Sequence, residues 1–104
     1  MIKLEFYVPE NFVDAVKTAI FNAGAGKIGN YDKCSWETKG FGQYRPLEKS
    51  NPFLGEKNKV TVVDEIKVET VCKKEYLKPV IQALKTAHPY ETPAYQYWEV
   101  NKEI

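Results

Sequence analysis

Apolar and polar side chains alternate along four stretches of the chain. In residues 2–8, IKLEFYV, the even-numbered residues are all apolar, which predicts a strand with one buried face. Residues 60–72, VTVVDEIKVETVC, are rich in β-branched side chains and predict a longer strand. Residues 34–44 and 94–100 predict two more strands, and the glycines inside residues 34–44 predict a bulge in that strand.

Two other stretches repeat their apolar residues with helical spacing. The first begins at Pro9-Glu10, and Gly24 lies where a helix C-cap glycine belongs. The second begins within residues 75–78, which leaves Pro79 in its first turn, and ends near His88 because Pro89 follows. The order β-α-β-β-α-β predicts an α+β, ferredoxin-like fold, with an antiparallel sheet and two helices on one face.

The composition is that of a single domain covering residues 1–104. Hydrophobic residues make up 43% of the chain, and the formal net charge is only +1. Lysines and glutamates are interspersed, so we expect no nucleic-acid partner, which would need a concentrated basic face. No apolar run is long enough to cross a membrane and the first residues lack a signal-peptide pattern, so we expect a cytoplasmic protein without a membrane partner.

The first six residues of GAGKIGNY, 24–31, match the dinucleotide-binding pattern G-x-G-x-x-G. That pattern requires a strand before it and a helix after it, because the N-terminus of the helix receives the pyrophosphate. Here a predicted helix precedes the glycines, so the favoured interpretation is a helix end and a tight turn. The alternative is a backbone-lined anion or nucleotide site of another type, with Lys27, Asn30 and Tyr31 as candidate ligand contacts.

Several blocks of residues, taken in order, resemble one protein family. They are GAGKIGNY, Cys34-Ser35, Pro46-Leu47-Glu48, Asn51-Pro52-Phe53-Leu54-Gly55, Lys67-Val68-Glu69-Thr70 and Ala87-His88-Pro89-Tyr90-Glu91-Thr92-Pro93-Ala94-Tyr95. In this order and spacing they resemble the domain inserted in the middle of NIF-three-like (NGG-one-interacting-factor-three-like, YqfO-type) proteins. Because the resemblance covers nearly the whole chain, we expect a stand-alone version of that insert domain.

The resemblance implies an assembly and a limit on function. The insert domain is similar to the PII and CutA proteins, ferredoxin-like units that tend to form trimers, so a homo-oligomer, most of all a trimer, is implied. The larger family members hold a dinuclear metal centre in domains that flank the insert. Those domains are not in this sequence, which has one histidine, so neither a metal-dependent hydrolase role nor a cyclohydrolase role is carried over.

The segment His88-Pro89-Tyr90-Glu91 offers two metal-ligand types. His88 and Glu91 could hold a divalent metal, copper or zinc, if Cys34, Cys72 or a neighbouring subunit completed the site. One histidine and one carboxylate are too few for a site within one chain. The favoured interpretation is therefore a helix stop with a capping histidine and a rigid turn, and no cofactor is certain.

The two cysteines fall on the two strands of the predicted hairpin. If the hairpin folds about its midpoint at residue 53, Cys34 and Cys72 lie near each other, which would allow a reversible disulfide or a shared soft metal. The same register sets Glu37 opposite Glu69, and like charges directly opposite are unfavourable. A shift of one residue would move the side chains to the other face. Two reduced, partly buried thiols are the favoured interpretation.

Loop 45–58 is long for a hairpin connection, which is typical of a functional loop. The loop at this place in PII proteins touches their partners, so the resemblance makes loop 45–58 a candidate site for a protein partner. Contact of the loop with another subunit, as in CutA-type trimers, is equally favoured. Tyr90 and Tyr95 belong to an aromatic band that could stack on a flat ligand, although a core or a subunit interface is the more usual role.

Three hypotheses for function follow. The leading one is a non-catalytic, oligomeric binding or regulatory module that binds a small ligand, a metal or a partner protein. The first alternative is a CutA-like divalent-metal-binding protein. The second alternative is an enzyme with a site at a subunit boundary, built from Lys27, Asn30, Tyr31, His88 and Glu91. We expect no enzyme, because the residues show no nucleophile with a base beside it.

Overall fold

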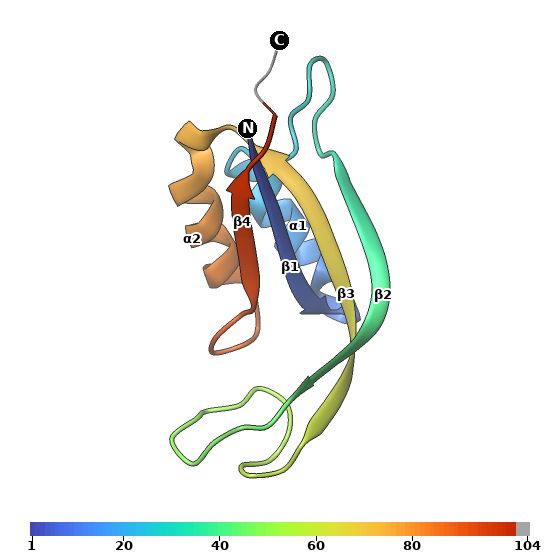
Figure 1. Cartoon of the computed structure of the whole chain (residues 1–104), viewed down its shortest axis with the longest axis vertical. Coiled ribbons are helices and arrows are strands. Elements are labelled where there is room, and N and C mark those ends of the chain that lie inside the picture. The colour runs from blue at the N-terminus through green and yellow to red at the C-terminus, as the bar shows by residue number, and fades with distance from the viewer. Residues whose placement is uncertain (102–104) are drawn as a thin grey trace.

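The computed structural model describes residues 1–101 and has the predicted order of elements (Figure 1). The strands and helices are β1 (Ile2–Pro9), α1 (Val13–Asn22), β2 (Ser35–Tyr44), β3 (Thr61–Cys72), α2 (Leu77–Ala87) and β4 (Tyr95–Glu99). Short 3₁₀ helices, η1 (Glu10–Phe12) and η2 (Lys74–Tyr76), lead into α1 and α2. The predicted α+β, ferredoxin-like fold is confirmed.

The four strands form one antiparallel sheet in the order β2-β3-β1-β4, and both α-helices cover the same face of it (Figure 1). The even-numbered side chains of β1 point to this face, as the alternation predicted. The buried core between the layers comprises Ile2, Leu4, Phe6, Val8, Val13, Val16, Ile20, Ala25, Ile66, Val68, Cys72, Val80 and Leu84. Within residues 1–101, neither helix is long and apolar enough to cross a membrane.

The segment GAGKIGNY ends α1 and turns the chain toward β2. Gly24 has a φ of 123°, a backbone conformation that glycine adopts without strain. Ile28 and Tyr31 then exchange two backbone hydrogen bonds, of 2.9 and 3.0 Å, around a tight turn. The dinucleotide pattern therefore has the geometry of a helix end and a turn, which was the favoured interpretation.

β2 and β3 pair without interruption over the ten residues of β2, so the bulge predicted at Gly40 or Gly42 is wrong. The two glycines occupy regular ladder positions opposite Glu65 and Val63. Because they have no side chains, the two glycines leave the surface of β2 open, and this surface lines the candidate site.

The register of the hairpin separates the cysteines. Glu37 lies one ladder position away from Glu69, so the pairing is shifted by one residue from the predicted register and the like-charge pair is avoided. Continuing the ladder places Cys34 beside Val71, whose side chain and that of Cys72 point to opposite faces. Both thiols are free, and Cys72 is buried in the core. The alternative in which Cys34 and Cys72 face each other required the midpoint register, which the structure does not have.

The far halves of β2 and β3 leave the two-layer body as an arm, defined here as residues 40–64 (Figure 1). β1 ends opposite Glu65, so the first residues of β3 pair only with β2. The molecule is consequently elongated, with extents of 49, 24 and 22 Å. The loop at the end of the arm curls back toward the segment between α2 and β4, and this curl forms the candidate site.

Candidate functional site

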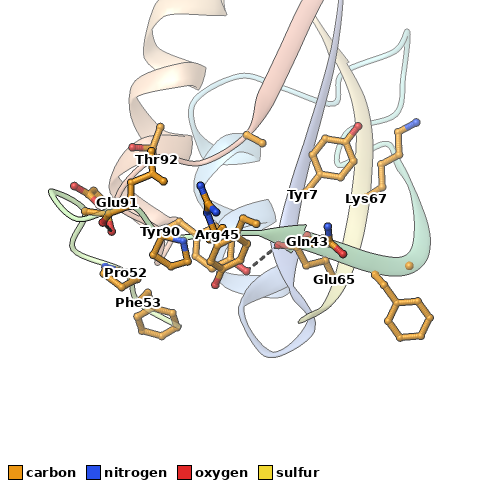
Figure 2. A pocket seen from close by; sticks show the side chains of 18 of the residues that line it. Tyr7, Gln43, Arg45, Pro52, Phe53, Glu65, Lys67, Tyr90, Glu91 and Thr92 are labelled. Atoms are coloured by element: carbon orange, nitrogen blue, oxygen red, sulfur yellow. Dashed lines mark hydrogen bonds between the residues drawn. The ribbon is translucent and has the colours of Figure 1, made fainter. Parts of the chain in front are cut away.

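A cleft of about 750 Å³ lies between the arm and the body, and we call it the arm cleft (Figure 2). Its volume falls within the range of roughly 300–1,000 Å³ that is usual for small-molecule sites. Nine of its twenty lining residues are aromatic or aliphatic: Tyr7, Phe41, Tyr44, Pro46, Leu47, Pro52, Phe53, Tyr90 and Ala94. Its charged side chains are Lys39, Arg45, Glu65, Lys67 and Glu91.

The segment after α2 holds the end of the arm in place. The backbone N–H of Asn51 donates a hydrogen bond of 2.8 Å to Oε2 of Glu91. The ring of Phe53 lies between two others, with centroid distances of 5.5 Å to Phe12 and 6.5 Å to Tyr90. The arm loop is therefore anchored to the body by one charge-assisted hydrogen bond and an aromatic cluster.

His88 is the inner support of this segment. The side chain is only 5% exposed, and its Nε2 lies 2.7 Å from the backbone oxygen of Tyr7. The backbone N–H of Tyr90 donates a hydrogen bond of 3.1 Å to Nδ1. One nitrogen donates and the other accepts, so the ring is neutral, and burial lowers the pKa of His88.

Tyr90 joins this support to the cleft. Its hydroxyl donates a hydrogen bond of 2.8 Å to Oε2 of Glu65 (Figure 2). The centroid of its ring lies 5.9 Å from that of the Tyr44 ring. Burial, with Glu65 as the second cause, raises the pKa of Tyr90, and burial also raises that of Tyr44. Both side chains are therefore neutral phenols at pH 7.

Gly42 makes this arrangement sterically feasible. A Cβ atom added at Gly42 would collide with Oε1 of Glu65, which shows that the carboxylate lies over the bare backbone of β2. At Gly40, by contrast, an added Cβ would meet no atom within 4 Å. The side chain of Glu65 therefore lies on the backbone at Gly42, and the space above Gly40, two residues earlier in β2, is open.

The glycine pair provides a matched test of this geometry. We expect Gly42→Ala to push Glu65 away from Tyr90 and lower the free energy of unfolding by about 1–2 kcal/mol relative to Gly40→Ala, because a charge-assisted hydrogen bond is lost. Urea denaturation measures the difference, and a spectrophotometric titration should show a lower pKa for Tyr90. Equal stability and equal titration of the two variants would contradict the arrangement.

Two of the three cations of the cleft are already paired. Lys39 forms a salt bridge of 3.1 Å with Glu10, and Lys67 one of 3.4 Å with Glu5. For Arg45, which is exposed, residues 1–101 provide no ion-pair partner. The positive charge available to a ligand in the cleft is therefore that of Arg45.

The candidate metal ligands are not assembled into a site. No group of three or more His, Cys, Asp or Glu side chains in the described part of the chain is arranged to hold a metal ion. Both nitrogens of His88 have hydrogen-bond partners, and Glu91 accepts from the arm loop. Cys34 and Cys72 lie at the other end of β3 from the arm. Within one chain, His88 and Glu91 lie in the same segment, but their side chains bind backbone groups there instead of forming a metal site.

The candidate ligand residues divide between the two ends of the sheet. Tyr90 lines the arm cleft, whereas Tyr95 packs on the core, with Nζ of Lys85 at 5.7 Å from its ring centroid. Lys27 lines a separate, smaller hollow of about 320 Å³ at the far end. Asn30 and Tyr31 belong to the exposed turn beside it. Within one chain the residues of the enzyme hypothesis therefore do not converge.

Sequence reasoning missed the carboxylate of the cleft. Glu65 sits in an alternating strand, where a polar residue is usually a solvent-facing one. Its position opposite Gly40 and its hydrogen bond to Tyr90 depend on the hairpin register and on the fold of the arm. The available signal was the pair of glycines at alternate positions of β2, Gly40 and Gly42. Two positions without side chains on one face of a strand leave room for a side chain from elsewhere or for a ligand.

No protein-family model matches the chain. The chain is 41% identical over 100 residues to "GTP cyclohydrolase 1 type 2 homolog" of Bacillus subtilis, covering 96% of this chain and 27% of the relative. The protein of the same name from Mycobacterium leprae is 42% identical over 93 residues, covering 89% and 24%. The chain thus spans about a quarter of the length of the curated relatives it matches.

Solved structures give the same picture. A Bacillus cereus protein related to NIF3 matches with a TM-score of 0.83 and 33% identity, over 97% of this chain and 26% of that one. The PII-like protein CutA from Nostoc matches with a TM-score of 0.68 and 15% identity, over 97% and 82%. CutA1 from Pyrococcus horikoshii matches with a TM-score of 0.68 and 17% identity, over 100% and 87%. The last two likenesses confirm the predicted CutA-like and PII-like fold, and the fold alone.

Proposed function

We propose that this chain, a relative of one segment of the NIF-three-like proteins, is a non-catalytic binding module that assembles into a homotrimer in the cytoplasm and receives a ligand in its arm cleft. The observation that carries this proposal is the arm, which departs from the body and exposes apolar side chains on both of its strands. Phe41 is 81% exposed, Val60 62% and Val62 59%. Apolar side chains gathered on a projecting element are typical of an interaction surface.

The arm offers two separate surfaces. The hairpin register places Phe41 opposite Asp64 and Val62 opposite Gln43, so Phe41 and Val62 share one face of the arm, whereas Gly40, Gly42 and Glu65 share the other. A neighbouring subunit that covers the apolar face would leave the glycine face of β2 open to a ligand. The trimer itself is the assembly that the resemblance to PII and CutA proteins implies.

The titratable groups of the cleft support binding rather than catalysis. Glu65 accepts from Tyr90, Glu91 accepts from the arm loop, and His88 supports the segment from behind. Each of these groups has a structural partner, and none of them is hydrogen-bonded to a serine, threonine or cysteine side chain in residues 1–101, so they form no base–nucleophile pair there. The cyclohydrolase name belongs to longer proteins, of which this chain matches about a quarter.

Native mass spectrometry of untagged protein tests the assembly. We expect a trimer for the natural chain and for Lys57→Ala, an exposed arm position outside the cleft lining. Val62→Lys should weaken association at least roughly tenfold, because it would bury a charge in the interface. A monomeric natural chain would contradict the proposal, and one copper or zinc ion per subunit would favour the metal-binding alternative.

A further inference from the structure

Three charged side chains that line the arm cleft, Glu65, Glu91 and Arg45, form no ion pair within residues 1–101 (Figure 2). Glu91 is exposed to water and accepts a hydrogen bond from the arm loop, so its charge is already stabilised. Glu65 is half-buried, and Arg45 is the one cation of the cleft that is not paired in this part of the chain. An unpaired anion and an unpaired cation in one cleft are complementary to a ligand that carries both charges.

The carboxylate of Glu65 provides the anionic side of this match. Its Oε2 accepts the hydrogen bond from Tyr90, whereas Oε1 lies over Gly42 and accepts no hydrogen bond from the residues described. The neutral phenol of Tyr90 satisfies one oxygen but leaves the negative charge unbalanced. A charge that is partly removed from water is stabilised by a partner of the opposite sign. A ligand ammonium brings that charge together with the N–H donors that an ionised carboxylate accepts.

The guanidinium of Arg45 provides the cationic side. Arg45 comes three residues after Gly42, so in an extended chain its backbone lies roughly 10 Å from the position over which Glu65 lies. A guanidinium binds a carboxylate through two parallel hydrogen bonds, and its single charge balances that of the carboxylate. A phosphate monoester carries about two charges at pH 7 and would leave one of them unbalanced. An ammonium and a carboxylate on the same carbon atom, each with its own hydrogen bond, fit within this span.

We propose that the arm cleft binds an α-amino acid with an aliphatic side chain, its ammonium at Glu65 and its carboxylate at Arg45. This assignment rests on the proposed binding function and names the ligand class of the same cleft. The rings of Tyr44, Tyr90 and Phe53 contact one another, so they form one continuous apolar wall without a gap for a further ring. An aliphatic side chain needs only such a wall, because its burial is non-directional.

Isothermal titration calorimetry on the full chain tests the assignment with L-leucine and two analogues that each lack one charge, isoamylamine without the carboxylate and isocaproate without the ammonium. We expect leucine to bind at least roughly tenfold more tightly than either analogue, because each analogue loses one charge-assisted contact. Glu65→Gln should weaken leucine and isoamylamine roughly tenfold and leave isocaproate unchanged. Arg45→Ala should weaken leucine and isocaproate roughly tenfold and leave isoamylamine unchanged, while Lys57→Ala binds all three as the natural chain does.

Circular dichroism shows whether each variant is folded. If Glu65→Gln unfolds, the three ligands on the natural chain and on the exposed Arg45→Ala variant still decide. A natural chain that does not bind leucine, or binds it no more tightly than the analogues, overturns the assignment, and so does an Arg45→Ala variant with unchanged affinity for leucine. Native mass spectrometry on the same samples separates this failure from that of the proposed function: a trimer that ignores leucine refutes the ligand class alone, and a monomer that prefers leucine refutes the assembly alone.

Discussion

Replacing Phe6 with alanine should lower the free energy of unfolding by about 4 kcal/mol. Phe6 is 0% exposed and is the largest of the fully buried side chains, at the centre of β1 and of the core between the sheet and the two helices. Truncation removes the ring and leaves a cavity. Because β1 is hydrogen-bonded to strands on both sides, its neighbours can collapse only partly into that space. Urea denaturation followed by circular dichroism measures the loss.

Tyr31→Ala is the matched control, since Tyr31 is also aromatic but 76% exposed. We expect its free energy of unfolding to change by no more than about 0.5 kcal/mol. The comparison should be made at one protein concentration, because assembly adds to apparent stability by mass action. Similar losses for Phe6→Ala and Tyr31→Ala would mean that the core is not where the structure places it.

The body of the fold was predictable because its signals are local. The alternation of residues 2–8 fixes which side chains of β1 face the helices, and Gly24 and Pro89 mark the ends of the two helices. Each signal depends on a few neighbouring residues: the pleat of a strand, the positive φ that glycine tolerates, and the restriction that a proline places on the residue before it.

The arm cleft was not predictable, because its geometry depends on long-range choices. A hairpin midpoint at residue 53 implied one register, and the structure has a register shifted by one, which moves every side chain of β2 to the other face. Only in the observed register does Gly40 lie opposite Glu65. The second requirement is that the arm loop curls back so that Asn51 meets Glu91, a contact across 40 residues.

His88→Ala should lower the free energy of unfolding by about 2 kcal/mol, because it leaves the carbonyl of Tyr7 and the N–H of Tyr90 without their buried partner. It should also loosen the arm loop, which hydrogen–deuterium exchange around residue 51 would detect. His88→Gln is the informative partner variant. Its amide can still donate to Tyr7 but does not titrate, so it should retain more of the stability.

The same pair of variants isolates a dependence on pH. Burial lowers the pKa of His88 and is the largest influence on it. The hydrogen bond to the carbonyl of Tyr7 and the charge of Glu65 raise the pKa and are outweighed. The unfolded histidine titrates near 6.5, so below that pH the unfolded state binds more protons than the folded one. The stability that neutral His88 provides is therefore complete above about pH 6.5 and falls as the pH drops, by at most about 1.4 kcal/mol per pH unit. Subtracting the His88→Gln profile removes the contribution of the carboxylates. A difference that stays flat between about pH 7 and 5 would mean that His88 is not the buried neutral support of the arm.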